Sequence, residues 1–147
     1  MSEVVRARTR PFGLLAIVVV AIFALVACNP QAEDQDFAML NSLRARSGVG
    51  ALARSAELNA KARAQADRMA SRGRIYHSSN LASGVSPGWR VIGENVAVAG
   101  SIEQAQTALE QSAGHLANMV NPQFTEVGVG VTVSRGRVYV VQVFVGR

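Results

Sequence analysis

The sequence contains two histidines, His77 and His115, and a carboxylate, Glu94, lies between them in the segment Gly93-Glu94-Asn95. Histidine is the commonest metal ligand in proteins and the side chain best suited to proton transfer near neutral pH. Two neutral imidazoles and one carboxylate match the ligand count of an open, catalytic-type zinc site, which keeps a position for water. The same groups could transfer protons without a metal. They are distant in the sequence, so only the fold can bring them together.

Each of these residues also has a purely structural interpretation. His77 suits an exposed loop, and His115 suits helix capping or a hydrogen bond in the core. Glu94 could accept backbone N–H bonds and so fix a loop, which an ionised carboxylate does well. Asn95 and Asn118 are expected to hydrogen-bond to backbone in irregular turns. The residue types alone leave metal binding, proton transfer and a structural role open.

The elements that hold these residues can be predicted from the spacing of apolar side chains. Apolar residues at helical spacing predict helices over residues 36–47 and 56–72. Gly73 is placed to end the second helix, which puts His77 just beyond a helix C-terminus. Residues 80–88 are rich in Ser, Gly and Pro, so we expect an irregular loop there.

A third helix is predicted to open at Ser101, where Gln104 lies three residues further on and completes a capping box. Its apolar stripe continues to residue 120, but Gly114 is expected to divide it. Ser112 would then cap a short fourth helix, which carries His115 near its start.

The C-terminal part of the sequence predicts strands. Valines at positions 127, 129, 131 and 133 alternate with glycine, threonine and serine, which is a strand pattern. Arg135-Gly136 predicts a tight turn, and residues 138–145 predict a mostly apolar strand that is covered on both faces. A third strand is expected around Val91 or at residues 96–98. Because helices come first and a hairpin last, the predicted fold class is α+β.

The N-terminal segment predicts export. Arg6, Arg8 and Arg10 precede an uncharged apolar run over residues 12–27, which has the length of a secretory signal and is short for a membrane-spanning helix. The run ends in Leu25-Val26-Ala27-Cys28, which resembles a bacterial lipoprotein box. We therefore expect residues 1–27 to be a lipoprotein signal peptide and Cys28 to carry the lipid, such as palmitate. An ordinary cleavage site and an uncleaved anchor helix are the alternatives.

After cleavage, residues 28–35 would form the lipidated cysteine and a short polar tether, and residues 36–147 one compact domain. Cys28 is the only cysteine, so the domain would contain no disulfide. Removing three arginines and one glutamate from the formal charge of +5 leaves the mature chain near +3. The sequence has no basic patch interleaved with aromatic residues, so we expect no nucleic-acid partner.

Four segments occur in the order of a known family. They are Tyr76-His77-Ser78, Gly93-Glu94-Asn95-Val96-Ala97, Ser112-Ala113-Gly114-His115-Leu116-Ala117-Asn118 and Glu126-Val127-Gly128-Val129-Gly130-Val131. Their order and composition closely resemble the CAP superfamily, also called SCP-like, which contains cysteine-rich secretory proteins, antigen 5 and pathogenesis-related plant proteins, with smaller bacterial relatives. The resemblance extends from the helix around residues 40–44 to the final hairpin. It implies a CAP-like α–β–α sandwich with a small antiparallel sheet between helices.

The resemblance also implies a functional cleft. In the CAP family the corresponding glutamate and histidines line a shared cleft, and the histidines hold a divalent metal, usually zinc. By resemblance these roles fall on His77, Glu94 and His115. Eukaryotic members add a second glutamate three residues after a helix tryptophan, and here Leu109 and Ser112 occupy those two positions. The missing carboxylate weakens any acid–base pair and with it the case for hydrolysis.

A row of cations accompanies the second helix. Arg54, Lys61, Arg68 and Arg72 fall within a narrow sector of a helical wheel. The ordinary interpretation is a solvated flank whose long side chains cover the edge of the core. The functional alternative is contact with an anionic lipid or a cell-wall polymer.

The sequence therefore favours a binding module over an enzyme. We expect an exported lipoprotein on the extracytoplasmic face of the cell membrane. His77, Glu94 and His115 would line a cleft for a lipid, a sterol or a cell-envelope component, with Zn²⁺ or another divalent metal on the two histidines. The alternative is a zinc-assisted hydrolase of cell-wall or protein substrates in which Glu94 would be catalytic, but the sequence has no serine or cysteine nucleophile motif to support hydrolysis without a metal.

Overall fold

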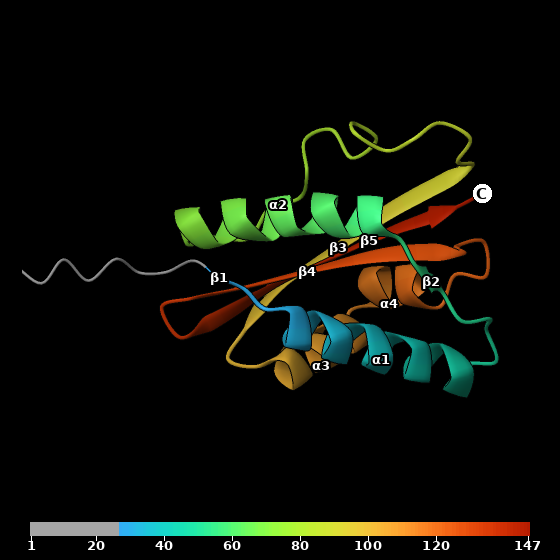
Figure 1. Cartoon of the computed structure of the whole chain (residues 1–147). Helices are drawn as coiled ribbons and strands as arrows, with labels where there is room; N and C mark the ends of the chain where they lie inside the picture. The colour runs from blue at the N-terminus through green and yellow to red at the C-terminus, as the bar shows by residue number, and fades with distance from the viewer. Residues whose placement is uncertain (1–26) are drawn as a thin grey trace, which may run out of the picture.

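The computed structural model describes residues 27–147, so the predicted signal peptide lies outside the described residues except for Ala27. The elements follow in the order β1 (Ala27–Cys28), α1 (Pro30–Arg46), β2 (Ala53–Arg54), α2 (Ala56–Arg72), β3 (Val91–Ala99), α3 (Ile102–Gln111), α4 (Ala113–Met119), β4 (Glu126–Ser134) and β5 (Arg137–Gly146) (Figure 1). Within the described residues, no helix combines the length and apolar character needed to cross a membrane.

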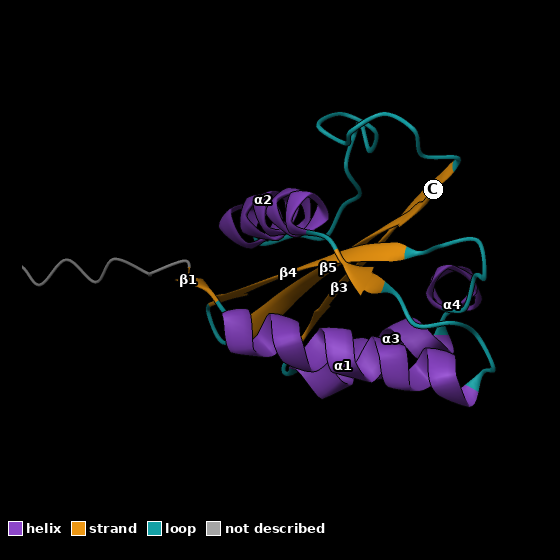
Figure 2. Ribbon diagram, turned by 45° about the vertical axis from the view of Figure 1, so that its right-hand side comes forward, coloured by secondary structure: helices purple, strands orange, loops and turns teal. Residues whose placement is uncertain are grey.

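The strands form one sheet between two layers of helices. Their spatial order is β1-β4-β5-β3 with antiparallel pairing, and β2 adds a short parallel pairing to β4. α2 covers one face of the sheet, here called the α2 face. α1, α3 and α4 cover the opposite face, called the α1 face (Figure 1 and Figure 2). This arrangement confirms the predicted α+β class and the α–β–α sandwich.

α1 begins at Pro30 and not at Asp36, which corrects the polar tether predicted over residues 28–35. Asn29 caps the helix, because its side-chain oxygen accepts a backbone N–H of the first turn at 3.1 Å. Glu33, in the predicted tether, is fully buried, and its Oε1 accepts from Arg63 Nε of α2 at 2.7 Å. One of the polar residues of this segment is thus a buried, paired carboxylate. The composition of the segment does not distinguish such a residue from a solvated one.

The boundaries of the other helices follow the sequence closely. α2 covers residues 56–72 as predicted, is capped by Ser55 and ends at Gly73, whose φ of 63° is left-handed. The third apolar stripe is divided as expected, but the break lies at Ser112, whose ψ of 114° is extended, and not at Gly114. Ser112 occupies the cap position of α4 without making a side-chain capping hydrogen bond.

The predicted strands are also present. β3 is a single strand that covers both places where a third strand was expected. β4 and β5 are joined at Arg135 and Gly136, whose φ values of 50° and 71° are both positive, as in the tight turns that match the twist of a hairpin. β5 is buried on both faces, as its apolar sequence predicts.

Two glycines of β4 determine how closely α2 approaches the sheet. A Cβ built on Gly128 would lie 2.0 Å from the backbone carbonyl carbon of Leu58, and one on Gly130 would lie 2.3 Å from that of Ala62. Both contacts are far shorter than any real Cβ contact, so α2 rests directly on the backbone of β4. The alternation of valine and glycine in β4 therefore reflects two buried faces, one filled by side chains and one by a helix.

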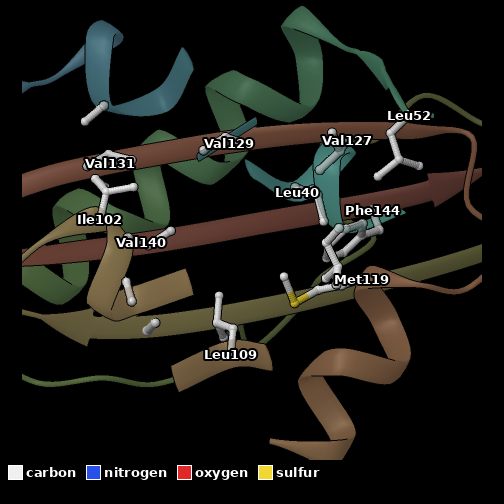
Figure 3. Close-up of a cluster of buried hydrophobic side chains, with 14 of the residues drawn as sticks. Leu40, Leu52, Ile102, Leu109, Met119, Val127, Val129, Val131, Val140 and Phe144 are labelled. Atoms are coloured by element: carbon white, nitrogen blue, oxygen red, sulfur yellow. The ribbon is translucent and has the colours of Figure 1, made fainter. Parts of the chain in front are cut away.

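Each face of the sheet has its own apolar core. Valines 127, 129 and 131 of β4 pack on the α1 face with residues from α1, α3 and α4 (Figure 3). On the α2 face, residues of α2 such as Leu58 and Met69 pack against Tyr139, Val141 and Val143 of β5. Because successive residues of a strand point to opposite faces, β3 and β5 contribute side chains to both cores, whereas β4 contributes side chains to the core of the α1 face alone.

Candidate functional site

His77, Glu94 and His115 meet at β3, which is an edge strand, although each comes from a different element. His77 lies in the loop after α2, Glu94 in the middle of β3 and His115 in α4. His77 Nδ1 lies 2.9 Å from Glu94 Oε1. The ring centroids of the two histidines are 6.4 Å apart, and the ring planes are inclined by 34°. The three side chains thus form one cluster.

The cluster can form because neighbouring residues of β3 point to opposite faces of the sheet. Glu94 lies on the α2 face, where the loop after α2 carries His77. Asn95 lies on the α1 face, and its Nδ2 donates to the backbone oxygen of His115 at 3.1 Å. This bond holds α4 against the edge strand. The two histidines therefore reach the edge of the sheet from its two sides.

Glu94 fixes the loop that carries His77. Its Oε1 accepts from His77 Nδ1 and, at 2.8 Å, from the backbone N–H of Ser78, while its Oε2 accepts from Ser78 Oγ at 2.5 Å. The Glu94 side chain is only 3% exposed, whereas that of His77 is 58% exposed. The loop-fixing role considered for Glu94 from the sequence is therefore present in the geometry. The sequence did not indicate this role for Ser78, which follows His77 directly.

The electrostatic environment favours a neutral His115. Burial lowers the pKa of His115 below its usual value, and the neighbouring His77 lowers this pKa further. A lowered pKa means that the imidazole keeps a free lone pair at neutral pH. Such a ring can bind a metal or accept a proton.

A chain of buried amides lies behind His115. Asn118 Nδ2 donates to Asn95 Oδ1 at 3.0 Å, and Asn95 Nδ2 also approaches Gln142 Oε1 at 3.2 Å. Gln142 Nε2 in turn donates to Asp36 Oδ2 at 2.9 Å. Neither asparagine lies in an irregular turn as predicted, since Asn95 is in β3 and Asn118 in α4. Asn95 does bond to backbone, but the Asn118 side chain bonds to another asparagine.

The series of hydrogen-bonded amides ends at Asp36, a buried carboxyl group with incomplete hydrogen bonding. It is fully buried in α1, and its Oδ1 has no hydrogen-bond partner. Burial raises the pKa of Asp36 to about 6, against opposing effects of the Gln142 hydrogen bond and the Arg54 charge. Sequence analysis missed both Asp36 and Gln142. Gln142 could have indicated a buried polar partner, because it is a lone amide inside the apolar sequence of β5.

The groups at the edge strand that could hold a metal are the two imidazoles, with Glu94 behind one of them. An ion with Zn–N distances of about 2.0 Å and tetrahedral angles would place two imidazole centroids about 5 Å apart. The centroids of His77 and His115 are 6.4 Å apart, which is wider than this spacing. Glu94 faces His77 Nδ1 and not the space between the rings. Among residues 27–147, no group of three or more His, Cys, Asp and Glu side chains is arranged to hold a metal.

The predicted row of cations is only partly one surface. Arg54 belongs to β2, donates to Asp34 at 2.6 Å and lies 4.4 Å from the centroid of the Phe37 ring. Its inclusion in the row is wrong, because α2 begins after Ser55 and the helical wheel does not extend to Arg54. Lys61, Arg68 and Arg72 do lie on α2.

The model of the Cysteine-rich secretory protein family, CAP, matches residues 37–144. An extracellular protein from Bacillus anthracis that contains an SCP domain has a similar structure, with a TM-score of 0.71 and 26% identity over 80% of this chain and 41% of that chain. The chain therefore spans less than half the length of that protein.

Two more distant structures share the fold. An outer surface protein from Borrelia burgdorferi gives a TM-score of 0.71 and 15% identity over 84% of this chain and 99% of that chain. The structure of NaASP2 with Zn²⁺ gives a TM-score of 0.59 and 18% identity over 80% of each chain. At such identities the likeness concerns the fold alone. No curated protein matches the chain.

Proposed function

The chain belongs to the CAP family, and from this premise we propose that it is an exported, membrane-anchored binding module with a divalent metal held between His77 and His115. The cleft beside the metal would accept a lipid, a sterol or another cell-envelope component. Glu94 would orient His77 through Nδ1, on the side of the ring away from the metal, and would not bind the metal.

The observation that carries this proposal is the contact between His77 and Glu94. With Nδ1 held 2.9 Å from the carboxylate, His77 has Nε2 free for a ligand. Metal-binding histidines are usually oriented by such a carboxylate, which also makes the ring a better ligand. His115 supplies the second imidazole, whose lowered pKa keeps it neutral. NaASP2, which shares the fold, contains Zn²⁺ in its structure.

A binding role has more support than hydrolysis. A zinc-assisted hydrolase would need Glu94 as the base that activates water. Both oxygens of Glu94 already accept hydrogen bonds from His77 and Ser78. Neither oxygen is therefore placed to take a proton from a water molecule. The position of the second family carboxylate is occupied by Ser112.

Membrane anchoring through Cys28 is supported by the sequence of residues 25–28 and by the similar proteins, one described as extracellular and one as an outer surface protein. Cys28 pairs with Thr132 in the sheet, so a lipid on Cys28 would hold the domain against the membrane with no intervening tether. We expect wild-type protein to incorporate labelled palmitate in cells and Cys28→Ala to lose the label. An unlabelled wild-type protein would rule out the anchor.

Calorimetric titration of zinc into the full chain, purified in a non-ionic detergent, tests the metal site. We expect saturable binding that His77→Ala or His115→Ala removes almost completely, with little further loss in the double variant. Affinity should decrease as pH falls through the imidazole range, because protonated histidine cannot bind a metal. Glu94→Gln should keep the site but weaken it roughly tenfold through loss of the orienting carboxylate.

Glu103→Gln is the matched control for Glu94→Gln, since it makes the same change on the exposed first turn of α3. Its zinc affinity should equal that of the wild type. Equal affinity in the wild type and the double histidine variant would refute the metal site and leave a binding module in which both histidines are structural.

A further inference from the structure

A depression of about 850 Å³ opens between α2 and the loop that follows it. This loop rises above α2 on the outer side of the molecule, between α2 and β3 (Figure 1). His77 lies on its rim. The other lining residues that matter here are Lys61, Arg68, Arg72, Arg74 and Tyr76. We call this depression the basic pocket.

The four cations of the basic pocket make no salt bridge with any carboxylate in the described part of the chain. Arg68 donates to Gln65 Oε1 at 2.8 Å, and Lys61 donates to the backbone oxygen of Ser83 at 2.7 Å. These acceptors are neutral. Lys61, Arg68, Arg72 and Arg74 therefore keep their charge available to an anion.

Tyr76 holds two of the guanidinium groups in position. Those of Arg72 and Arg74 each lie 5.2 Å from the centroid of the Tyr76 ring, and Arg72 Nη1 donates to the Tyr76 hydroxyl at 2.6 Å. The backbone oxygen of Tyr76 accepts from the buried Gln65 at 2.6 Å. Because the arginines are positioned before a ligand arrives, less conformational entropy is lost on binding.

The nearby acidic groups are already engaged. Glu57, at the rim of the pocket, accepts from the backbone N–H and the hydroxyl of Ser86 and lies 3.5 Å from Arg147. Glu94 accepts from His77 and Ser78. Glu94 also attracts Lys61 through space, but neither carboxylate forms a salt bridge with a cation of the pocket, and four cations outnumber the two carboxylates.

We propose that the basic pocket binds a phosphate group, carried either by a phospholipid headgroup or by a free phosphate ester. This inference rests on the proposed role as a binding module and narrows its ligand. A phosphate offers several acceptor oxygens and up to two negative charges, which suits a cluster of cations better than a single carboxylate does. The planar guanidinium fork binds two phosphate oxygens at once.

The position of the pocket makes a lipid headgroup accessible. Cys28 pairs with Thr132 in the sheet, and Thr132 Oγ1 donates to Asp67 Oδ1 of α2 at 2.6 Å. Asp67 directly precedes Arg68. A domain held to the membrane at Cys28 would therefore keep this part of α2 close to the lipid headgroups.

The test is a calorimetric titration of inorganic phosphate, and of glycerol phosphate, into the full chain in a non-ionic detergent. We expect saturable binding that weakens as salt is added, since screening reduces attraction between exposed charges. The affinity of the double variant Arg68→Gln with Arg72→Gln for phosphate should be at least roughly tenfold lower, because the variant loses two charge-assisted hydrogen bonds. Arg46→Gln, an exposed change on α1, should stay within about twofold of the wild type.

The two sources of phosphate are separated by adding phosphatidylglycerol or phosphatidylcholine to the micelles. Tighter binding to phosphatidylglycerol micelles than to glycerol phosphate assigns the headgroup, and equal binding assigns the free ester. If the double variant does not fold, Arg74→Gln provides the same test from a residue beyond the end of α2. Equal phosphate affinity in the wild type and in the pocket variants, or no saturable binding at all, overturns the proposal.

Zinc titration of the same double variant separates this inference from the proposed metal site. Zinc affinity should be unchanged, because neither arginine touches His77 or His115. Loss of phosphate binding with zinc binding retained supports the pocket, whereas phosphate binding that is lost only in the histidine variants would assign the phosphate to the metal and contradict it.

Discussion

The two faces of the sheet are packed on different principles. On the α2 face, a helix rests directly on the glycines of β4, at distances that leave no room for a methyl group. On the α1 face, valine side chains of β4 fill the space beneath α1 and α3 (Figure 3). The only buried side-chain atoms without a partner in the described residues, Asp36 Oδ1 and Gln106 Oε1, belong to α1 and α3.

This difference shows how the site is divided between a rigid and an adaptable part. On the α2 face, Glu94 of β3 and the loop with Ser78 lie beside α2, which carries part of the basic pocket and rests on the backbone of β4. The α1 face carries His115 on a short helix, supported by amides and a carboxyl group whose hydrogen bonding is incomplete. Tight packing transmits strain, whereas an unsatisfied polar group costs stability but can change its partner.

The sharpest test of this comparison uses two neighbouring residues of β4. Gly128→Ala adds a carbon on the α2 face, 2.0 Å from the Leu58 backbone, and should lower the free energy of unfolding by about 4 kcal/mol, beyond ordinary overpacking because backbone must move. Val129→Ala removes carbons on the α1 face and should cost only about 2 kcal/mol. Urea denaturation of the full chain measures both.

Gly114→Ala is the control for the glycine substitution. A Cβ at Gly114 would meet nothing within 4 Å, and alanine favours helix over glycine, so stability should rise by up to about 1 kcal/mol. If Gly128→Ala proved as stable as the wild type, α2 would not be seated on the backbone of β4 and the two faces would be packed alike.

Most of the fold could be predicted because local signals agreed with the tertiary structure. The start and end of α2 depend on Ser55 and Gly73, and the hairpin depends on a turn with positive φ, all of which are readable locally. The start of α1 could not be predicted, because the burial of Glu33 depends on Arg63, which lies 30 residues away. Polar residues in a segment before a helix look the same whether they are solvated or paired.

The candidate site could be predicted only in part. The grouping of His77, Glu94 and His115 came from a family resemblance, since no periodicity links residues on three separate elements. The hydrogen bonds of Glu94 to Ser78 and of Gln142 to Asp36 depend on strand register and helix placement, which the sequence pattern does not specify. The basic pocket was partly visible as a row of cations, but Arg74 and Tyr76 come from the loop and Arg54 lies elsewhere.

A smaller effect, on the α1 face, should come from Asp36. Its pKa is raised to about 6 from 3.8 by burial, so the folded protein retains a proton that the unfolded chain releases. The stabilising contribution of neutral Asp36 is complete below about pH 4 and is lost as pH rises to about 6, a change of about 3 kcal/mol. Asp36→Asn should abolish this change, because an amide does not titrate and can still accept from Gln142.

The measurement is the free energy of unfolding of the wild type and of Asp36→Asn at pH 4 and pH 7. The free energy of unfolding of the variant should rise relative to that of the wild type by about 2 kcal/mol between the two pH values, because unfolded Asp36 is already partly ionised at pH 4 and effects of the other titrating groups cancel in the difference. Asp34→Asn is the control, because Asp34 is 72% exposed and bonded to Arg54 at the surface, and it should gain less than about 1 kcal/mol. A gap between Asp36→Asn and the wild type that stays constant with pH would mean that Asp36 is ionised in the fold. Burial would then not raise the pKa of Asp36, and Asp36 would no longer support the contrast between a rigid and an adaptable half of the site.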